Sequence, residues 1–212
     1  MKKLFALLLA ALMVFSMTAC GETTEPPVTT TAPTTEATEP TPMGTLYVAF
    51  GATLELTYDA NGNALTMEGT NELGKTLAAA KQDQVGKGCV FVLRAVFRYA
   101  SDNQLLGDTK SMVLRIGAGE KMPTEDFIEV IATDCQYLAD EECTGVRMAP
   151  LTGDKLDEQG NLTYNTALSL ACRFMDALEE DVISDGSITE GVYTFTYHSI
   201  SVTVDAFTGL VT

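Results

Sequence analysis

The sequence has no tryptophan and one histidine, and its basic side chains are few. Its 212 residues hold 13 Lys and Arg against 29 Asp and Glu, which gives a net charge of -16. Proteins that bind nucleic acids need clustered basic side chains, so nucleic-acid binding is disfavoured. The only long apolar run covers residues 4–15, whereas a membrane-spanning helix needs about 20 apolar residues. A polytopic membrane protein is excluded, and the 46% apolar content fits one or two globular domains.

Sequence motifs for catalysis are also missing. There is no glycine-rich phosphate loop, no Gly-x-Ser-x-Gly elbow and no pair of histidines. His198 falls at an expected chain reversal and is interpreted as a solvated turn residue. The acidic runs 140–142 and 179–181 fall where helices should end, which favours exposed charge over a carboxylate pair for acid-base catalysis. We therefore expect no enzyme, with no catalytic residue, no cofactor and no metal site.

Residues 1–19 have the layout of a secretory signal, with two lysines, an apolar run and a small-residue approach to Cys20. The stretch Met17-Thr18-Ala19-Cys20-Gly21 resembles the lipobox of bacterial lipoproteins, although Met17 stands where leucine is usual. The resemblance implies cleavage before Cys20 and a diacylglyceryl group on its thiol, and two acyl chains are enough for stable anchoring. The alternative is an ordinary secretory signal that happens to end in cysteine.

Residues 20–43 are expected to form a flexible stalk. Between positions 22 and 42 the sequence holds nine threonines, five prolines and four glutamates, and Val28 is the only large aliphatic residue. Such a composition cannot bury a core. Proline-rich chain extends by about 3.1 Å per residue, so the segment can hold a domain away from the bilayer. A glycan-decorated, mucin-like tract is the alternative interpretation of the threonines.

The folded region should begin near residue 44 with strands. Residues 48–58 alternate between apolar and mostly polar side chains, which predicts one strand with a solvated face. Residues 59–63 contain the pair Asn61-Gly62, which favours a tight hairpin turn before a second strand over 64–68. A calcium loop is the alternative, but Gly62 stands at the fourth position and no glutamate follows at the twelfth.

Three short motifs in this region match a known family. Leu54-Glu55-Leu56, Asn61-Gly62 and Asn71-Glu72-Leu73-Gly74 resemble the extracytoplasmic middle domain of RsgI-type anti-sigma factors, and the resemblance extends over residues 44–151. The family's self-cleaving Asn-Pro pair falls on Gly51-Ala52 here, so self-cleavage is not carried over. Family members that hold sigma factors add a cytoplasmic domain and a membrane span, so we expect no direct contact with a sigma factor.

Helices and one more strand should follow. Residues 88–99 suit either a buried helix or a strand, and the resemblance favours the helix. Residues 112–116 indicate a short strand. Thr124 is expected to cap a helix, and Asn165 to cap another. The predicted inward stripes of these two helices are Phe127, Ile131, Cys135 and Leu138 in the first, and Leu168, Cys172, Met175 and Leu178 in the second.

The C-terminal residues predict a β-hairpin. Apolar side chains alternate with polar ones on both sides of a reversal at His198-Ser199. With the preceding helix, this ending resembles the last hairpin of a PepSY-type domain, which would make residues 152–212 a separate PepSY-like part. The fold class expected for the whole chain is α+β, with antiparallel hairpins packed with about three helices after the signal peptide and stalk.

Four cysteines remain in the folded region: Cys89, Cys135, Cys143 and Cys172. An even number in an exported domain permits three disulfide pairings. Cys135 and Cys172 fall on apolar helix stripes, which favours small buried thiols over a disulfide. None of the four has the Cys-x-x-Cys spacing of a zinc site.

Together these features predict a non-enzymatic lipoprotein that is extracytoplasmic and anchored to the cell membrane through the lipid on Cys20. The stalked module would bind or sense an extracellular ligand or a membrane or surface protein. The alternative is a regulator or inhibitor of an extracytoplasmic peptidase, acting through the PepSY-like tail. A hydrolase ranks third because no motif supports it.

Overall fold

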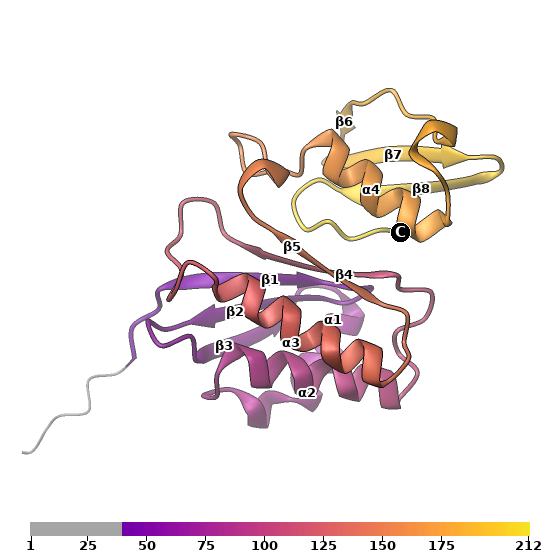
Figure 1. The fold of residues 1–212 in the computed structure, drawn as a ribbon. Coiled ribbons are helices and arrows are strands. Elements are labelled where there is room, and N and C mark those ends of the chain that lie inside the picture. The colour runs from indigo at the N-terminus through magenta and orange to yellow at the C-terminus, as the bar shows by residue number, and fades with distance from the viewer. Residues whose placement is uncertain (1–39) are drawn as a thin grey trace, which may run out of the picture. The chain divides into compact units, whose positions relative to one another are not determined.

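The computed structural model describes residues 40–212, so the predicted signal segment, Cys20 and most of the predicted stalk lie outside the described residues. Within this range the predicted α+β class is confirmed (Figure 1). The strands are β1 (Gly44–Ala49), β2 (Thr53–Tyr58), β3 (Ala64–Gly69), β4 (Ser111–Ile116), β5 (Arg147–Leu151), β6 (Ile188–Thr189), β7 (Val192–Tyr197) and β8 (Ile200–Asp205). The α-helices are α1 (Glu72–Ala80), α2 (Cys89–Asp102), α3 (Phe127–Glu141) and α4 (Tyr164–Met175), with 3-10 turns η1 (Gln82–Gln84), η2 (Gly153–Lys155) and η3 (Glu179–Asp181).

The first five strands form one sheet in the order β3-β2-β1-β4-β5, and the last three form a second sheet in the order β6-β7-β8. Three of the pairs in the larger sheet are antiparallel, but β5 pairs parallel to β4. The predicted antiparallel hairpins are present in β1–β2 and β2–β3, and the parallel pair β4–β5 was not predicted. Parallel neighbours need a crossover connection, and α3 lies between these two strands in the sequence.

The single strand predicted over residues 48–58 is wrong, because the chain turns at residues 50–52. Gly51 has a φ of 86°, and the Phe50 N–H donates to the Ala52 carbonyl oxygen at 2.9 Å. In the resulting hairpin Val48 pairs with Leu54. Both partners have even numbers, so the apolar alternation continues through the turn without a break. Periodicity therefore could not reveal the reversal.

The predicted turn over 59–63 is confirmed, and the carboxylate of Asp59 organises it. Asp59 Oδ1 accepts hydrogen bonds from the backbone N–H groups of Asn61 and Asn63, each at 2.9 Å. Gly62 has a φ of 76°, which glycine adopts at little cost. The strand β3 then returns against β2, as expected.

Residues 40–212 contain four α-helices where about three were expected, because α1 was not predicted. Its N-cap is Asn71, whose Oδ1 accepts from Gly74 N at 2.8 Å and from Thr53 N at 3.1 Å. The Asn71 amide nitrogen donates to the Gly51 carbonyl oxygen at 2.9 Å. One side chain thus joins the start of α1 to the β1–β2 turn. The choice of helix over strand for residues 88–99 is confirmed by α2.

Both predicted helix caps are displaced. The helix α3 starts at Phe127 with Asp126 as its N-cap, rather than at Thr124. The helix α4 has Thr163 as its N-cap, and the predicted cap Asn165 lies inside the helix. The left-handed conformation of Asp176 ends α4, so Leu178 lies beyond it with 64% of its surface exposed.

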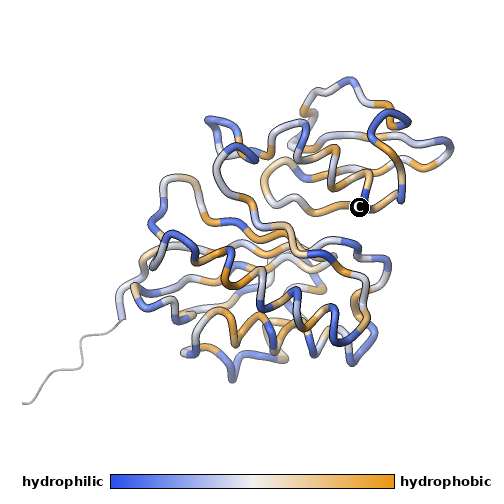
Figure 2. Tube along the Cα trace, in the orientation of Figure 1, coloured by the Kyte–Doolittle hydropathy of each residue, from blue (hydrophilic) through white to orange (hydrophobic). Residues whose placement is uncertain are grey.

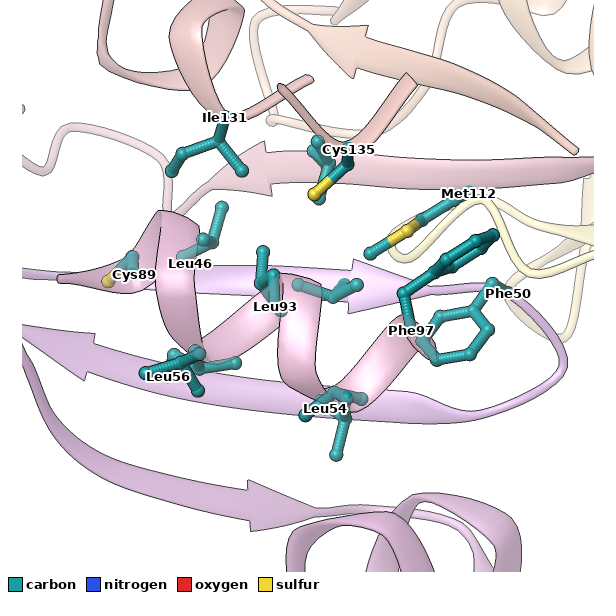
Figure 3. Packing of buried hydrophobic residues seen from close by; sticks show 14 of the residues in the cluster. Leu46, Phe50, Leu54, Leu56, Cys89, Leu93, Phe97, Met112, Ile131 and Cys135 are labelled. Carbon is teal, nitrogen blue, oxygen red and sulfur yellow. The ribbon is translucent and has the colours of Figure 1, made fainter. Parts of the chain in front are cut away.

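Two hydrophobic clusters lie on opposite faces of the five-stranded sheet. Even-numbered side chains of β1 and β4 pack with α2 and α3 in the first cluster, and Figure 3 shows Leu93 and Phe97 of α2 within it. Odd-numbered side chains, Ala49 and Val113, pack with α4 and the C-terminal hairpin in the second. In Figure 2 hydrophobic stretches (orange) recur along the strands and helices, interrupted by hydrophilic residues (blue). Residues 112–116 of β4 are all buried, and the strand is a mostly apolar run rather than a clean alternation, as expected for a strand covered on both faces.

Candidate functional site

His198 lies in the turn between β7 and β8 and is exposed, with a φ of 52°. Its ring packs against Tyr197, with 4.2 Å between the ring centroids. The interpretation of His198 as a solvated turn residue is therefore confirmed. The C-terminal hairpin is also confirmed, with Tyr193, Phe195 and Val204 buried.

The four described cysteines are free thiols, and three of them, Cys89, Cys135 and Cys172, are buried, whereas Cys143 is exposed. Burial raises the pKa of Cys89 and of Cys135 to about 12. A thiol with such a pKa stays protonated at neutral pH, so it is a poor nucleophile. The expectation of buried thiols on the α3 and α4 stripes is thus confirmed for Cys135 and Cys172.

The two acidic runs differ in their surroundings. Residues 179–181 form the exposed turn η3, as expected. In the first run, the Glu142 side chain is only 17% exposed, and its Oε1 accepts from Arg98 Nε at 3.0 Å. The expectation of fully solvated charge is therefore wrong at Glu142, because the side chain of Arg98 on α2 reaches across to the end of α3. Across residues 40–212, no three His, Cys, Asp or Glu side chains gather as metal ligands would.

A cavity of about 390 Å³ lies between β5 and α4. One wall is strand β5, from Met148 to Leu151, and the floor includes the η2 turn with Asp154 and Lys155. The opposite wall is α4, from its N-cap Thr163 onwards. Pockets of 300–1,000 Å³ commonly hold small ligands, so this cavity is large enough for one.

Three polar side chains form a row along the side of α4 that lines the cavity. Asn165, Ser169 and Arg173 follow one another at four-residue spacing and therefore share one side of the helix. All three are exposed, whereas Leu168 and Cys172 of the same helix are buried. A rise of 1.5 Å per residue makes the row about 12 Å long. Within residues 40–212, the side chains of Asn165 and Ser169 form no hydrogen bond with other protein groups, so both are available to a ligand.

Two cations lie at this cavity, although the chain is strongly acidic. Lys155 Nζ donates to the Pro150 carbonyl oxygen, and Arg173 Nη1 donates to Ser111 Oγ at 3.3 Å. Neither forms an ion pair with a carboxylate within the part of the chain that the structure describes. Asp154 is the one carboxylate of the lining and is exposed. The site is thus richer in hydrogen-bond donors than in acceptors, which suits an anionic or carbonyl-bearing ligand.

The outer edge of β5 is occupied by side chains. The side chain of Gln136 on α3 makes the hydrogen bonds that a neighbouring strand would make. Its Oε1 accepts from Met148 N at 2.9 Å, and its Nε2 donates to the Val146 carbonyl oxygen at 3.3 Å. Pro150 has no N–H to offer, and its carbonyl oxygen is bonded by Lys155. An edge protected in this way is a poor template for another strand. A partner must therefore bind through side-chain grooves rather than by extending the sheet.

Sequence reasoning missed this cavity, because it joins a strand and a helix that were not placed next to each other. One signal was available. The apolar stripe of α4 leaves Asn165, Ser169 and Arg173 on the opposite side at a regular spacing of four residues. Such a row indicates a polar helix face, but the spacing alone does not show that β5 faces it.

No protein-family model and no curated protein matches the chain. The predicted lipidation site, Cys20, lies outside the described residues. None of the helices in residues 40–212 combines the length and hydrophobicity needed to cross a bilayer.

Proposed function

We propose that the protein is an extracytoplasmic lipoprotein, held at the membrane by a lipid on Cys20, whose folded part is a binding or sensing module and not an enzyme. In this proposal residues 44–151 are an RsgI-like domain, and residues 152–212 are a PepSY-like part. The lipobox-like sequence around Cys20 supports the anchoring, and the motifs given above support the two family assignments.

The observation that carries the binding function is the cavity between β5 and α4. Among residues 40–212, it offers Asn165 and Ser169 as polar groups without a hydrogen-bond partner, and Lys155 and Arg173 as cations without a carboxylate partner. Charged donors bind carboxylates through short, strong hydrogen bonds. We therefore assign to this cavity an elongated polar ligand with at least one carboxylate, such as a peptide end or an acidic sugar.

A binding titration on the mature chain with Cys20→Ser tests the ligand class. The probes are a short peptide with a free carboxylate, the same peptide with an amidated end, and a uronic-acid trisaccharide. We expect the carboxylate-bearing probes to bind and the amidated peptide to bind at least tenfold more weakly. Arg173→Ala should weaken binding by at least tenfold, because the loss of a charged hydrogen bond costs about 1.5–3 kcal/mol.

The matched control is Lys75→Ala, which removes one exposed cation far along the chain from the cavity. Among residues 40–212, Lys75 forms one ion pair, with Glu72 at 2.8 Å. The binding proposal fails if Lys75→Ala and Arg173→Ala weaken the probes equally, because the effect would then be one of net charge. It also fails if none of the carboxylate probes binds.

Regulation of an extracytoplasmic peptidase is the second candidate, because α4 of the PepSY-like part forms one wall of the same cavity. Here the carboxylate would belong to the peptidase. Cross-linking in intact cells separates the two candidates. Enrichment of a peptidase that is lost with Arg173→Ala favours the regulator, and enrichment of glycan or of a membrane sensor favours the sensing module.

A further inference from the structure

The helix α3 has a second exposed surface that the cavity between β5 and α4 does not use. Tyr137 is 71% exposed and Val130 is 48% exposed. They lie seven residues apart, which is two helical turns, and therefore share one side of α3. The opposite side of the helix, with Ile131 and Cys135, is fully buried.

Two hollows of about 370 and 360 Å³ lie along this surface, and they share Glu129, Thr133 and Tyr137. The first hollow extends to Met148 and Pro150 of β5. Together they form one groove along α3, which we call the α3 groove, and Tyr137 lines both of its hollows. Single exposed apolar side chains are common on protein surfaces, but a tyrosine between two adjoining hollows offers an anchor for a partner.

The charge of the α3 groove is negative at one end. Asp126 lines the second hollow and Glu129 lines both, near the start of α3, and both side chains are exposed. Neither forms an ion pair among residues 40–212, whereas Asp140 at the far end is paired with Arg147 at 3.3 Å. Unpaired carboxylates beside apolar groups select a partner that carries basic side chains beside its own apolar ones.

The blocked edge of β5 indicates the secondary structure of the partner segment. Gln136, Pro150 and Lys155 occupy or remove the outward hydrogen-bonding groups of the strand, so an added strand would find few partners. A helix satisfies its own backbone and needs only side-chain contacts. The groove follows α3 from Asp126 to Asp140, about 21 Å at 1.5 Å per residue, which matches a helix of roughly 14 residues.

We propose that the α3 groove docks a cationic amphipathic helix of a partner protein. The apolar side chains of that helix pack on Tyr137 and Val130, and its Lys or Arg side chains pair with Asp126 and Glu129. This interaction surface adjoins the cavity between β5 and α4, because its first hollow shares Met148 and Pro150 with that cavity. The residues on which the docking depends, Tyr137, Val130, Asp126 and Glu129, do not line the cavity, so the two proposals can be tested independently.

The test uses the mature chain with Cys20→Ser and a synthetic 14-residue helical peptide of leucine and lysine, labelled for fluorescence anisotropy. A peptide with glutamate in place of lysine is the charge control. We expect the leucine–lysine peptide to bind in helical form and the leucine–glutamate peptide to bind at least tenfold more weakly. Tyr137→Ser with Val130→Ser should weaken binding at least tenfold, and Asp126→Asn with Glu129→Gln at least threefold.

Leu178→Ser is the matched control, because Leu178 is also exposed, at 64%, and lies outside α3. Circular dichroism and the melting temperature verify that each variant is folded. The proposal is overturned if Leu178→Ser weakens binding as much as the Tyr137 and Val130 changes, because attraction would then be non-specific. It is also overturned if the bound peptide is extended, or if sedimentation shows a dimer that Tyr137→Ser dissociates.

Discussion

The guanidinium carbon of Arg115 lies 4.0 Å from the centroid of the Phe207 ring, and Arg115 Nη1 donates to the carbonyl oxygen of the same residue. Arg115 belongs to β4 and is completely buried, while Phe207 follows β8. Tyr47 of β1 packs edge-on against the same ring at 5.2 Å. Burial lowers the pKa of Arg115, and the opposing charges of Tyr47, Asp205 and Asp157 offset part of that effect. One buried cation thus joins the large sheet to the C-terminal hairpin.

Arg115→Ala should lower the free energy of unfolding by about 3 kcal/mol, because it leaves a cavity beside the Phe207 ring. Arg115→Met should cost about 1 kcal/mol, because methionine refills most of the volume and gives up only the Nη1 bond to Phe207 and the contact of the charge with its ring. Within residues 40–212, Nε and Nη2 of Arg115 have no hydrogen-bond partner to lose. Urea denaturation measures both. If Arg115→Met is as damaging as Arg115→Ala, the buried charge itself stabilises the fold, contrary to this expectation.

Asn71→Ala should lower the free energy of unfolding by about 2 kcal/mol, because it removes an N-cap together with two hydrogen bonds to the β1–β2 turn. Asn103→Ala is the matched control. Its amide donates only to Tyr99 O, at the exposed end of α2, so we expect a loss below about 0.5 kcal/mol. Equal losses in the two variants, measured by urea denaturation, would show that Asn71 does not join α1 to the turn.

The buried thiols predict a loss of stability in alkali. An unfolded thiol ionises near its ordinary pKa of 9.0, whereas burial raises the pKa of Cys89 and Cys135 to about 12. Between these values the unfolded chain binds fewer protons than the folded one, so stability is complete below pH 9 and falls as the pH rises towards 12. Each buried thiol should lower the free energy of unfolding by about 1 kcal/mol as the pH rises from 9 to 10.

Denaturation curves at pH 8, 9 and 10 check this for the natural chain and for a variant with Cys89→Ala and Cys135→Ala. The variant should be less stable at pH 8, because it loses buried volume, but its stability should fall less steeply above pH 9. A slope that is the same in both proteins would mean that the thiols ionise freely in the folded state. Tyr58, whose pKa burial raises to about 12, adds a similar loss only above pH 10.

Turn residues and hydrophobic alternation predicted most of the helices and strands. They failed where contacts between distant segments determine the structure. The Asn61-Gly62 turn and the C-terminal hairpin follow from turn chemistry and alternation, and both are confirmed. The β1–β2 turn was not predicted. Even-numbered residues of β1 pair with even-numbered residues of β2, so the apolar alternation in the sequence continues past Gly51. The strand β5 was also not predicted. It is only partly buried, and it contains Pro150, a residue that argues against a central strand.

The candidate site was the least predictable part. Its polar row on α4 was visible as a spacing of four residues, but its second wall is β5, which follows α3 in the sequence and pairs with β4. The edge of β5 is blocked by the side-chain amide of Gln136, which bonds to the strand backbone. Nothing in the local sequence indicates that this amide takes the hydrogen bonds of a neighbouring strand. Such sites arise from the packing of elements, which periodicity along one segment does not encode.

The lipid anchor is tested at Cys20. We expect the mature protein to begin at Cys20, to carry a diacylglyceryl group and to partition with membranes, because two acyl chains give stable anchoring. Cys20→Ala should either release the protein or leave it unprocessed. Mass spectrometry of the N-terminal peptide reads both the cleavage site and the modification. An unmodified Cys20, or cleavage at another residue, contradicts the anchoring proposal.

Site-specific photo-cross-linking in intact cells tests the binding function most directly. A photoreactive residue at position 169, where Ser169 faces the cavity between β5 and α4, is compared with one at Ala79, an exposed position on α1. We predict a discrete adduct from position 169, identified by mass spectrometry, whose yield falls at least fivefold with Arg173→Ala. No comparable adduct should form from position 79. The same adducts from both positions, or an adduct that Arg173→Ala leaves unchanged, would contradict a binding site in this cavity.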